Sequence, residues 1–168
     1  MGVELLEQRY QDFIAKNPHT IETLKRLSDQ NNLIQLNMRA LLDTITAELC
    51  PDCKAPCCQC MPVEGWFTEG DYFVYRADND APLNLRVDHG IPNGCAFLGD
   101  KGCVLPPGSR PFPCVKVNCK SVSTRLEQND TLKKFKQLYD AMDALQEKLW
   151  HIINPDKAQE THSGDVPA

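Results

Sequence analysis

The sequence predicts a mainly α protein in which a helical hairpin or bundle flanks an irregular, cysteine-rich core. Apolar residues recur at helical spacing towards both ends of the 168-residue chain. Five of its nine cysteines lie within residues 50–60, and residues 77–120 carry no sustained helical or strand period. A chain of this length fits one structural domain. We divide it into N-terminal helices (1–49), the cysteine-rich core (50–122), a C-terminal helix (123–153) and a disordered tail (154–168).

The N-terminal region is predicted to hold two helices that meet at Asn17-Pro18. Residues 3–16 place their apolar side chains on one face, between acidic and amide residues. Because Asn is a favoured N-cap and Pro fits the first helical turn, the dipeptide is expected to end one helix and begin the next. The apolar face of the first helix consists of Val3, Leu6, Tyr10, Phe13 and Ile14.

The second helix is predicted over residues 18–49, with apolar residues spaced alternately by threes and fours. Asn31 stands where an apolar residue is expected, either as a residue that sets helix register or as a tolerated, solvent-facing position. The stripe fits an intramolecular hairpin, which we favour, or a homodimer or other protein partner bound through residues 18–49. Its members are Leu24, Leu27, Ile34, Met38, Leu41 and Ile45.

The region after the first cysteines begins with a helix-start signal. Thr68 and Asp71 have the spacing of an N-cap and an acidic residue three positions later, which predicts a short helix. Trp66 and Phe67, just before it, are expected either to cover the cysteines or to be ordinary core aromatics. Residues 77–120 are rich in Pro, Gly, Asn and Asp, which predicts turns with one short strand pair.

A strong helical pattern returns near the end of the chain. Asp130 is a suitable N-cap for this helix, and Asn154-Pro155 is expected to close it. The small, polar residues that follow carry no apolar stripe and are expected to be disordered. The apolar face of the helix consists of Leu132, Phe135, Leu138, Tyr139, Met142, Leu145, Leu149, Ile152 and Ile153.

Composition narrows the classes of function. The chain shows no basic region followed by a long apolar run, so we expect neither a secretory signal nor a membrane span, and we place the protein in the cytoplasm. In that reducing compartment, nine cysteines indicate a metal or cluster framework rather than disulfides. The net charge of −5 and the lack of a Lys/Arg-rich patch argue against nucleic acid as a partner.

The cysteine spacing favours metal ligation. Cys50-x-x-Cys53 is a chelating turn whose two sulfurs can reach one ion, as in zinc and iron–sulfur sites. Adjacent side chains such as Cys57 and Cys58 diverge, so they fit two neighbouring ions, separate corners of one cluster, or one ligand and one packing residue. A vicinal disulfide would strain the backbone, and a thioredoxin-like pair lacks the surrounding βαβ pattern, so both alternatives are less favoured.

Residues 50–115 contain an ordered combination of motifs: Cys50-x-x-Cys53-x-x-x-Cys57-Cys58, Cys95-Ala-Phe97-Leu98, Gly102-Cys103 and Arg110-Pro111-x-x-Cys114. The combination resembles the YkgJ-type cysteine-cluster family, described as a zinc- or iron-chelating domain. A similar pattern occurs in flagellin lysine-N-methylases, where the family is associated with an iron–sulfur cluster, so we favour an iron–sulfur cluster over zinc. The resemblance implies a metal-binding core, and the flanking helices lie outside it.

The resemblance also implies a ligand set for this metal centre: Cys50, Cys53, Cys57, Cys58, Cys95, Cys103 and Cys114. The residues themselves add Cys119 as an eighth candidate, whereas Cys60 has no secure place in the pattern. Eight thiolates match two four-coordinate zinc ions or two cubane clusters, and fewer match one cluster plus packing cysteines. Arg110 belongs to the motif and is expected to hold a loop carbonyl or carboxylate near the cofactor.

Three functions are compatible with these features. We favour a binding protein that ligates an iron–sulfur cluster or zinc through two cysteine-rich loops, for electron transfer or metal handling. The second is an accessory or catalytic component of an iron–sulfur-dependent enzyme in methyl transfer or redox chemistry, although the chain has no recognisable nucleotide or S-adenosylmethionine site. The third is a structural zinc protein whose helices form an interaction surface.

Overall fold

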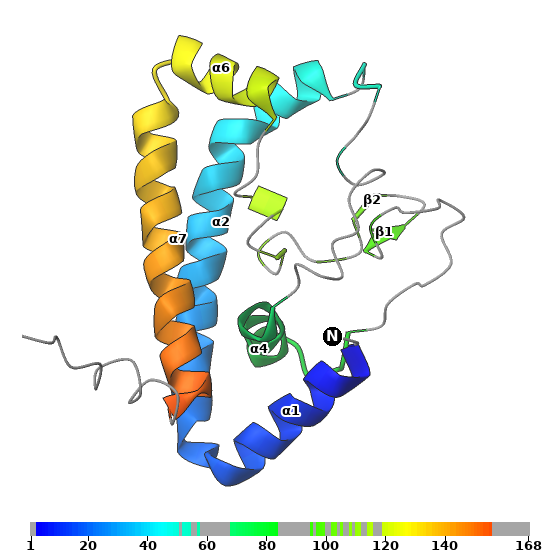
Figure 1. Ribbon diagram of the computed structural model, residues 1–168, viewed down its shortest axis with the longest axis vertical. Coiled ribbons are helices and arrows are strands. Elements are labelled where there is room, and N and C mark those ends of the chain that lie inside the picture. Colours follow the sequence, from blue (N-terminus) through cyan, green and yellow to red (C-terminus); the bar gives the residue numbers. More distant parts are fainter. Residues whose placement is uncertain are drawn as a thin grey trace, which may run out of the picture.

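The computed structural model shows a mainly helical protein, as the sequence predicts. Two long helices run side by side in opposite directions, and the shorter elements are arranged around them (Figure 1). The structure describes residues 3–50, 52–54, 57, 68–83, 95, 97–99, 102–103, 105, 108, 110–111, 114–115 and 119–155.

The N-terminal helices are α1 (Val3–Lys16) and α2 (Ile21–Leu49), joined through a 3-10 turn, η1 (Pro18–Thr20). Asn17 separates them as predicted, but its side chain does not cap the second helix. Its Nδ2 instead donates to the carbonyl oxygen of Phe13 at 3.0 Å and so completes the end of α1. The proline that opens η1 has no N–H group, which leaves fewer donors for a cap on that side.

The capped helix and the strand pair predicted after the first cysteines are both present. The helix is α4 (Glu69–Asp78), which contacts α1, α2 and α7. The Thr68 hydroxyl accepts from the Asp71 N–H at 3.1 Å, and the Asp71 carboxylate accepts from the Thr68 N–H at 3.0 Å, which confirms the capping box. The antiparallel strand pair consists of β1 (Leu98–Gly99) and β2 (Gly102–Cys103).

The C-terminal region departs from its predicted boundaries. Residues 123–153 were expected to form one helix, but the structure contains two, α6 (Lys120–Gln128) and α7 (Leu132–Ile153). α6 also begins inside the range assigned to the cysteine-rich core, 50–122. The core therefore ends in regular structure directly after its last cysteine.

A tight turn explains the division, and it corrects the expected N-cap of the last helix. Asp130 does not cap α7; it adopts a positive φ of 58°, and Thr131 occupies the position before the helix. The N–H and hydroxyl of Thr131 donate to the carbonyl of Leu126 at 3.0 and 3.2 Å. This closure reverses the chain through a left-handed residue, which Asp tolerates better than most side chains. At the other end, Asn154 caps α7 as predicted.

The long pair consists of α2 and α7, and both ends of the pair are crossed by a shorter helix. α1 lies at the end where α2 begins, and α6 lies across the end where α2 finishes (Figure 1). α4 packs beside the middle of the pair, and β1 and β2 lie on the side away from α7 (Figure 1). The favoured intramolecular packing of α2 is thus present in the described part of the chain.

Three clusters of buried apolar side chains hold these elements together. The strand-side cluster consists of Leu6, Tyr72, Tyr75, Leu83, Cys95, Phe97 and Leu105. The α4 cluster consists of Leu24, Leu27, Phe73, Val74, Leu145, Leu149 and Ile153. The α6 cluster consists of Met38, Leu42, Ile45, Val115, Val122, Leu126, Phe135 and Met142.

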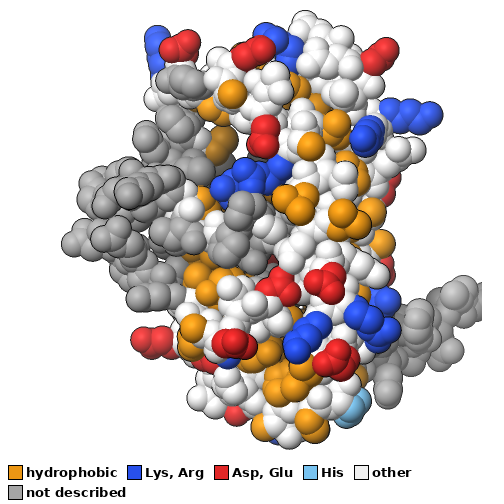
Figure 2. Space-filling model, turned by 180° about the vertical axis from the view of Figure 1, so that it is seen from behind, with side chains coloured by type: hydrophobic (Ala, Val, Ile, Leu, Met, Phe, Trp, Pro, Cys, Tyr) orange, Lys and Arg blue, Asp and Glu red, His pale blue; other side chains and the backbone are white. Residues whose placement is uncertain are grey.

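The surface mixes charge types. Figure 2 shows Lys/Arg and Asp/Glu side chains interspersed with hydrophobic ones over the described residues of one face. Among the helices that the structure describes, none combines the length and the apolar character that crossing a membrane requires.

Some predictions fall on positions that the structure does not describe. These are the covering role of Trp66 and Phe67, the ligation by Cys58, and the disordered tail from residue 156 onward.

Candidate metal centre

The first group of cysteines lies at the C-terminal end of α2. Cys50 caps the helix, with its N–H donating to the carbonyl of Thr46 at 2.9 Å. The N–H of Cys53 donates back to the carbonyl of Cys50 at 3.1 Å, which closes a turn around the Cys-x-x-Cys pair. Cys50, Cys53 and Cys57 are all exposed, so their sulfurs are accessible to a ligand.

Cys119 occupies the N-cap position of α6, 69 positions after Cys50 in the chain. Its carbonyl accepts the N–H of Ser123 at 3.0 Å, and its exposed side chain makes no capping hydrogen bond.

α6 is held across the end of α2 by apolar packing and one ion pair. Val122 and Leu126 are 4% and 1% exposed and belong to the α6 cluster together with Ile45 of α2. Arg125 Nη1 lies 2.6 Å from Oε2 of Glu48, in the last turn of α2. These contacts fix the element that carries Cys119 beside the element that carries Cys50.

The pKa of the Cys50 thiol is affected by cysteines of both segments. Partial desolvation raises the pKa of the Cys50 thiol, and the charges of Cys119, Cys53 and Cys57 raise it further. Cys119 acts more strongly on this pKa than the two cysteines of Cys50's own segment. Thiolates gathered in this way repel one another, and a bound cation is the natural means of offsetting that repulsion.

Two other predicted ligands lie in an apolar environment. Cys95 is 4% exposed within the strand-side cluster, and the partly buried Cys103 packs against the same cluster from β2. Their surroundings, which include Leu6 and Tyr72, are those of a hydrophobic core. Cys95 and Cys103 are thus buried or partly buried, whereas the other described cysteines are exposed.

Cys114 lies in a turn, in which its N–H donates to the carbonyl of Pro111 at 2.9 Å. Its side chain is exposed, whereas the next residue, Val115, is 3% exposed and belongs to the α6 cluster. Cys114 is therefore anchored through the same apolar cluster that holds α6.

No ready-made coordination sphere exists in the part of the chain that is described. Among these residues, no three Cys, His, Asp or Glu side chains are arranged closely enough to hold a metal ion. The thiols of Cys50, Cys53 and Cys57 at the end of α2 and of Cys119 at the start of α6 would have to move closer together to ligate one ion.

Arg110, the predicted cofactor-binding residue, is tied to α2 through its backbone. Its carbonyl oxygen accepts a hydrogen bond from Nε2 of Gln35 at 2.7 Å. The Nε of Arg110 is buried and has no hydrogen-bond partner within the described structure. The role of Arg110 in holding a carbonyl or carboxylate near a cofactor therefore stays a prediction.

Sequence reasoning missed a row of polar residues on the buried face of α2. Ser28, Asn31 and Gln35 are all at most 3% exposed, and each donates to a backbone carbonyl of another segment. Asn31 is therefore neither solvent-facing nor merely tolerated. The signal that could have revealed the row is its spacing, because polar residues three and then four positions apart share one helix face.

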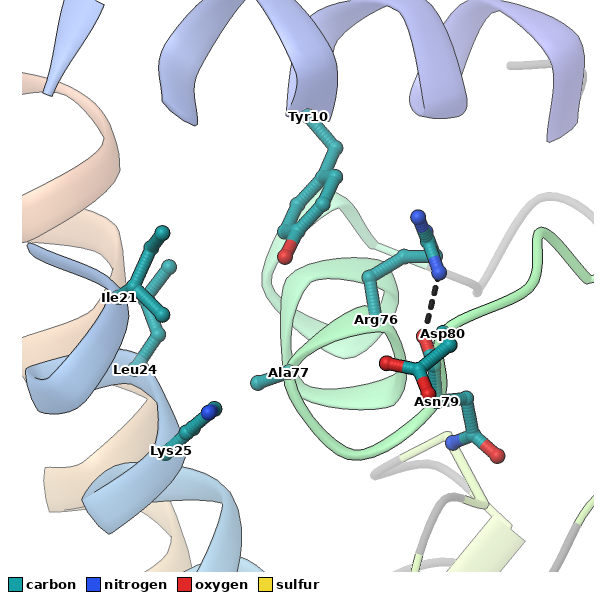
Figure 3. Close-up of a pocket in the computed structure, with 8 residues that line it drawn as sticks. All are labelled: Tyr10, Ile21, Leu24, Lys25, Arg76, Ala77, Asn79 and Asp80. Atoms are coloured by element: carbon teal, nitrogen blue, oxygen red, sulfur yellow. Dashed lines mark hydrogen bonds between the residues drawn. The ribbon is translucent and has the colours of Figure 1, made fainter. Parts of the chain in front are cut away.

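A separate cavity of about 210 Å³ opens where α1, α2 and α4 meet (Figure 3). Arg76 lines it, but its Nε lies 2.9 Å from Oε2 of Glu7 and its Nη1 donates to the carbonyl of Asn79. Its guanidinium carbon also lies 5.1 Å from the centre of the Tyr10 ring, a cation–π arrangement. Arg76 is thus engaged in joining α1 to α4, and we assign no ligand to the cavity.

Comparison with known proteins gives no match: no family model, curated protein or solved structure is similar to this chain.

Proposed function

We propose that this protein binds a thiolate-ligated metal centre through Cys50, Cys53, Cys57 and Cys119. One observation carries the proposal: α6, whose N-cap is Cys119, packs against the end of α2, whose C-cap is Cys50. Two segments distant in the sequence thereby contribute thiols to one place. No nitrogen or oxygen ligand is needed to complete a four-coordinate set.

Four thiolates fit either of two centres. They match one tetrahedral zinc ion or one cubane iron–sulfur cluster. We favour the cluster because the cysteine motifs resemble those of a family associated with iron and sulfur. A bound cluster would supply one-electron transfer, and a bound zinc ion would act as a structural cross-link or a transferable cargo.

Metal binding is expected to be coupled to local ordering. Because the four sulfurs do not form a finished site among the described residues, part of the binding free energy must move them together. The flanking helices need not change, because α6 is held to α2 by Leu126 and by the Arg125–Glu48 pair. Cys58, Cys95, Cys103 and Cys114 remain candidate ligands through the family resemblance, for a larger cluster or a second ion.

The direct test is metal and sulfide analysis of the full chain purified without oxygen. A brown protein with thiolate-to-iron charge-transfer absorption and stoichiometric acid-labile sulfide would support the cluster. A colourless protein with stoichiometric zinc would support the thiolate site and overturn our preference for iron. Absence of any stoichiometric metal, also after reconstitution with iron, sulfide or zinc, would overturn the proposal.

The ligand assignment is tested by single Cys-to-Ser variants. Cys50→Ser and Cys119→Ser should each lower bound metal to well below the wild-type stoichiometry, because each removes one of four thiolates. Cys60→Ser is the matched control, since the sequence predicts no ligand role for Cys60. Wild-type metal content in Cys119→Ser would show that α6 contributes nothing to the site.

A further inference from the structure

The buried face of α2 recognises backbone positions of other segments. Ser28 Oγ donates to the carbonyl of Val74 at 3.0 Å, Asn31 Nδ2 to that of Gly108 at 2.9 Å, and Gln35 Nε2 to that of Arg110 at 2.7 Å. A buried hydrogen-bond donor left without a partner is costly. Each of these donors therefore favours the packing position in which a backbone carbonyl accepts its hydrogen bond. The first contact holds α4. The other two hold the segment that runs from residue 108 to residue 119, which we call the second cysteine-rich segment.

Two amides of α2 bind two carbonyls of the same segment. Asn31 and Gln35 are one helical turn apart, a rise of about 6 Å. Their carbonyl partners, Gly108 and Arg110, are two positions apart in the other segment. The pair therefore sets both the position and the direction of this segment on α2.

The close approach at residue 108 depends on glycine. A Cβ atom added to Gly108 would lie 2.2 Å from Oδ1 and 2.7 Å from Cγ of Asn32. The Asn32 side chain is itself held, because its Nδ2 donates to Oδ2 of Asp78 at 2.5 Å. Any side chain at position 108 would thus push the backbone away from the Asn31 amide.

Later residues of the same segment meet α2 at successively later points. Pro111 is fully buried, and Val115 belongs to the apolar cluster that contains Met38 and Ile45 of α2. Cys119 then begins α6, which is joined to the last turn of α2 by the Arg125–Glu48 pair. The distance to be covered along α2 from residue 31 to residue 50 is about 28 Å, and a chain from 108 to 119 can span up to about 36 Å.

We propose that Asn31 and Gln35 are positioning residues of the thiolate centre. By fixing where Gly108 and Arg110 lie on α2, they set the register that brings Cys119 to Cys50. The inference rests on the proposed function only where metal binding is measured. The proximity of Cys50 and Cys119 can be measured in the metal-free protein.

The test compares Gln35→Met with Ser28→Ala in the full chain. Both variants remove one buried hydrogen bond of α2, and Met keeps the approximate volume of Gln. In the metal-free protein, a short thiol-specific cross-linker is applied, and the Cys50–Cys119 product is quantified by peptide mass spectrometry. Gln35→Met should lower its yield, whereas Ser28→Ala, which loosens only the contact to α4, should keep the wild-type yield.

The metal readout uses cobalt(II), whose thiolate charge-transfer absorption reports the ligand set. The loss of one hydrogen bond to a positioned backbone should weaken cobalt binding by about fivefold in Gln35→Met. Asn37→Ala, which removes an exposed amide of the same helix, should leave the affinity unchanged. Circular dichroism establishes that each variant remains helical.

Gly108→Ala is a second, independent way to displace the segment, and it should lower the cross-link yield as Gln35→Met does. Wild-type cross-linking in both Gln35→Met and Gly108→Ala would overturn the positioning role. If the wild-type chain binds neither cobalt nor iron, the proposed function fails, but the cross-linking comparison still decides the register. The two failures are therefore distinguishable.

Discussion

The guanidinium of Arg125 lies 2.6 Å from the carboxylate of Glu48, and this pair joins α6 to the last turn of α2. The residues are 77 positions apart in the chain, and they join the helix that Cys50 ends to the helix that Cys119 begins. Packing of Val122 and Leu126 supports the same contact from the buried side. The thiolate centre that we propose would thus lie at a junction between two helices.

The ion pair itself should contribute little to stability. Its side chains are 37% and 53% exposed, and such pairs are worth about 0–1 kcal/mol because water screens them. We expect Arg125→Ala to lower the free energy of unfolding by less than about 1 kcal/mol, measured by urea denaturation. Repeating the measurement at high salt is the control, because the difference from wild type should shrink there.

The apolar side of the junction should matter more. Leu126 is 1% exposed, so Leu126→Ala should lower the free energy of unfolding by about 2–5 kcal/mol through lost burial and a cavity. Leu33, on α2, is 63% exposed, and Leu33→Ala should change the free energy of unfolding by less than about 0.5 kcal/mol. Equal effects in denaturation experiments would contradict the placement of α6.

Cys95 is a metal ligand according to the family resemblance, but the structure places it away from the exposed cysteines at the end of α2, in the strand-side cluster. Because Cys95 lies in the strand-side cluster, Cys95→Ala should cost about 1 kcal/mol of stability and leave the metal content unchanged. Metal analysis and urea denaturation of the same preparation test both parts. A metal loss as large as that of Cys119→Ser would return Cys95 to the ligand set.

The capping box at the start of α4 makes a local contribution. Thr68→Ala removes the hydroxyl that accepts the Asp71 N–H, and should lower the free energy of unfolding by about 1 kcal/mol. Thr44→Ala, at an exposed position within α2, is the matched control and should be neutral or slightly stabilising because Ala has the higher helix propensity. Thermal unfolding of the two variants should therefore shift in different directions or by clearly different amounts.

Glu7 should make stability depend on pH in the acid range. Burial alone would raise its pKa, but hydrogen bonds from Tyr72 and Gln11 and the charge of Arg76 lower it on balance below the ordinary 4.5. A carboxyl with a lowered folded-state pKa stabilises the fold above its unfolded-state pKa, and this contribution is lost as pH falls through the folded-state value.

Glu7→Gln should accordingly be less stable than wild type at pH 7, with a difference that shrinks as the pH falls below 4.5. Urea denaturation at a series of pH values provides the measurement. Glu4→Gln, at an exposed position of the same helix, is the control and should follow the wild-type profile. A difference that stays constant down to low pH would show that Glu7 acts through packing and not through its charge.

The sequence by itself determined most of the helices. The boundaries of α1 and the end of α2 follow from apolar periodicity and from Pro and Asn, and α4 follows from its capping box. These signals are local, because the residues that create them are within one or two turns of each other. The turn that separates α6 from α7 escaped prediction because it depends on Asp130 in a left-handed conformation, which the periodicity on either side does not reveal.

Only the tertiary structure decided which cysteines become neighbours. The motif pattern treats Cys50, Cys95 and Cys103 alike, but the fold places the first at an exposed helix end and the other two beside a hydrophobic cluster. Cys119 lies beside the end of α2 because Val122 and Leu126 pack in one cluster with α2 residues, and Asn31, 77 positions before Gly108, binds the segment that precedes Cys119. Such contacts depend on which backbone carbonyl accepts a hydrogen bond from a buried amide, and the spacing of residues along the chain does not predict that pairing.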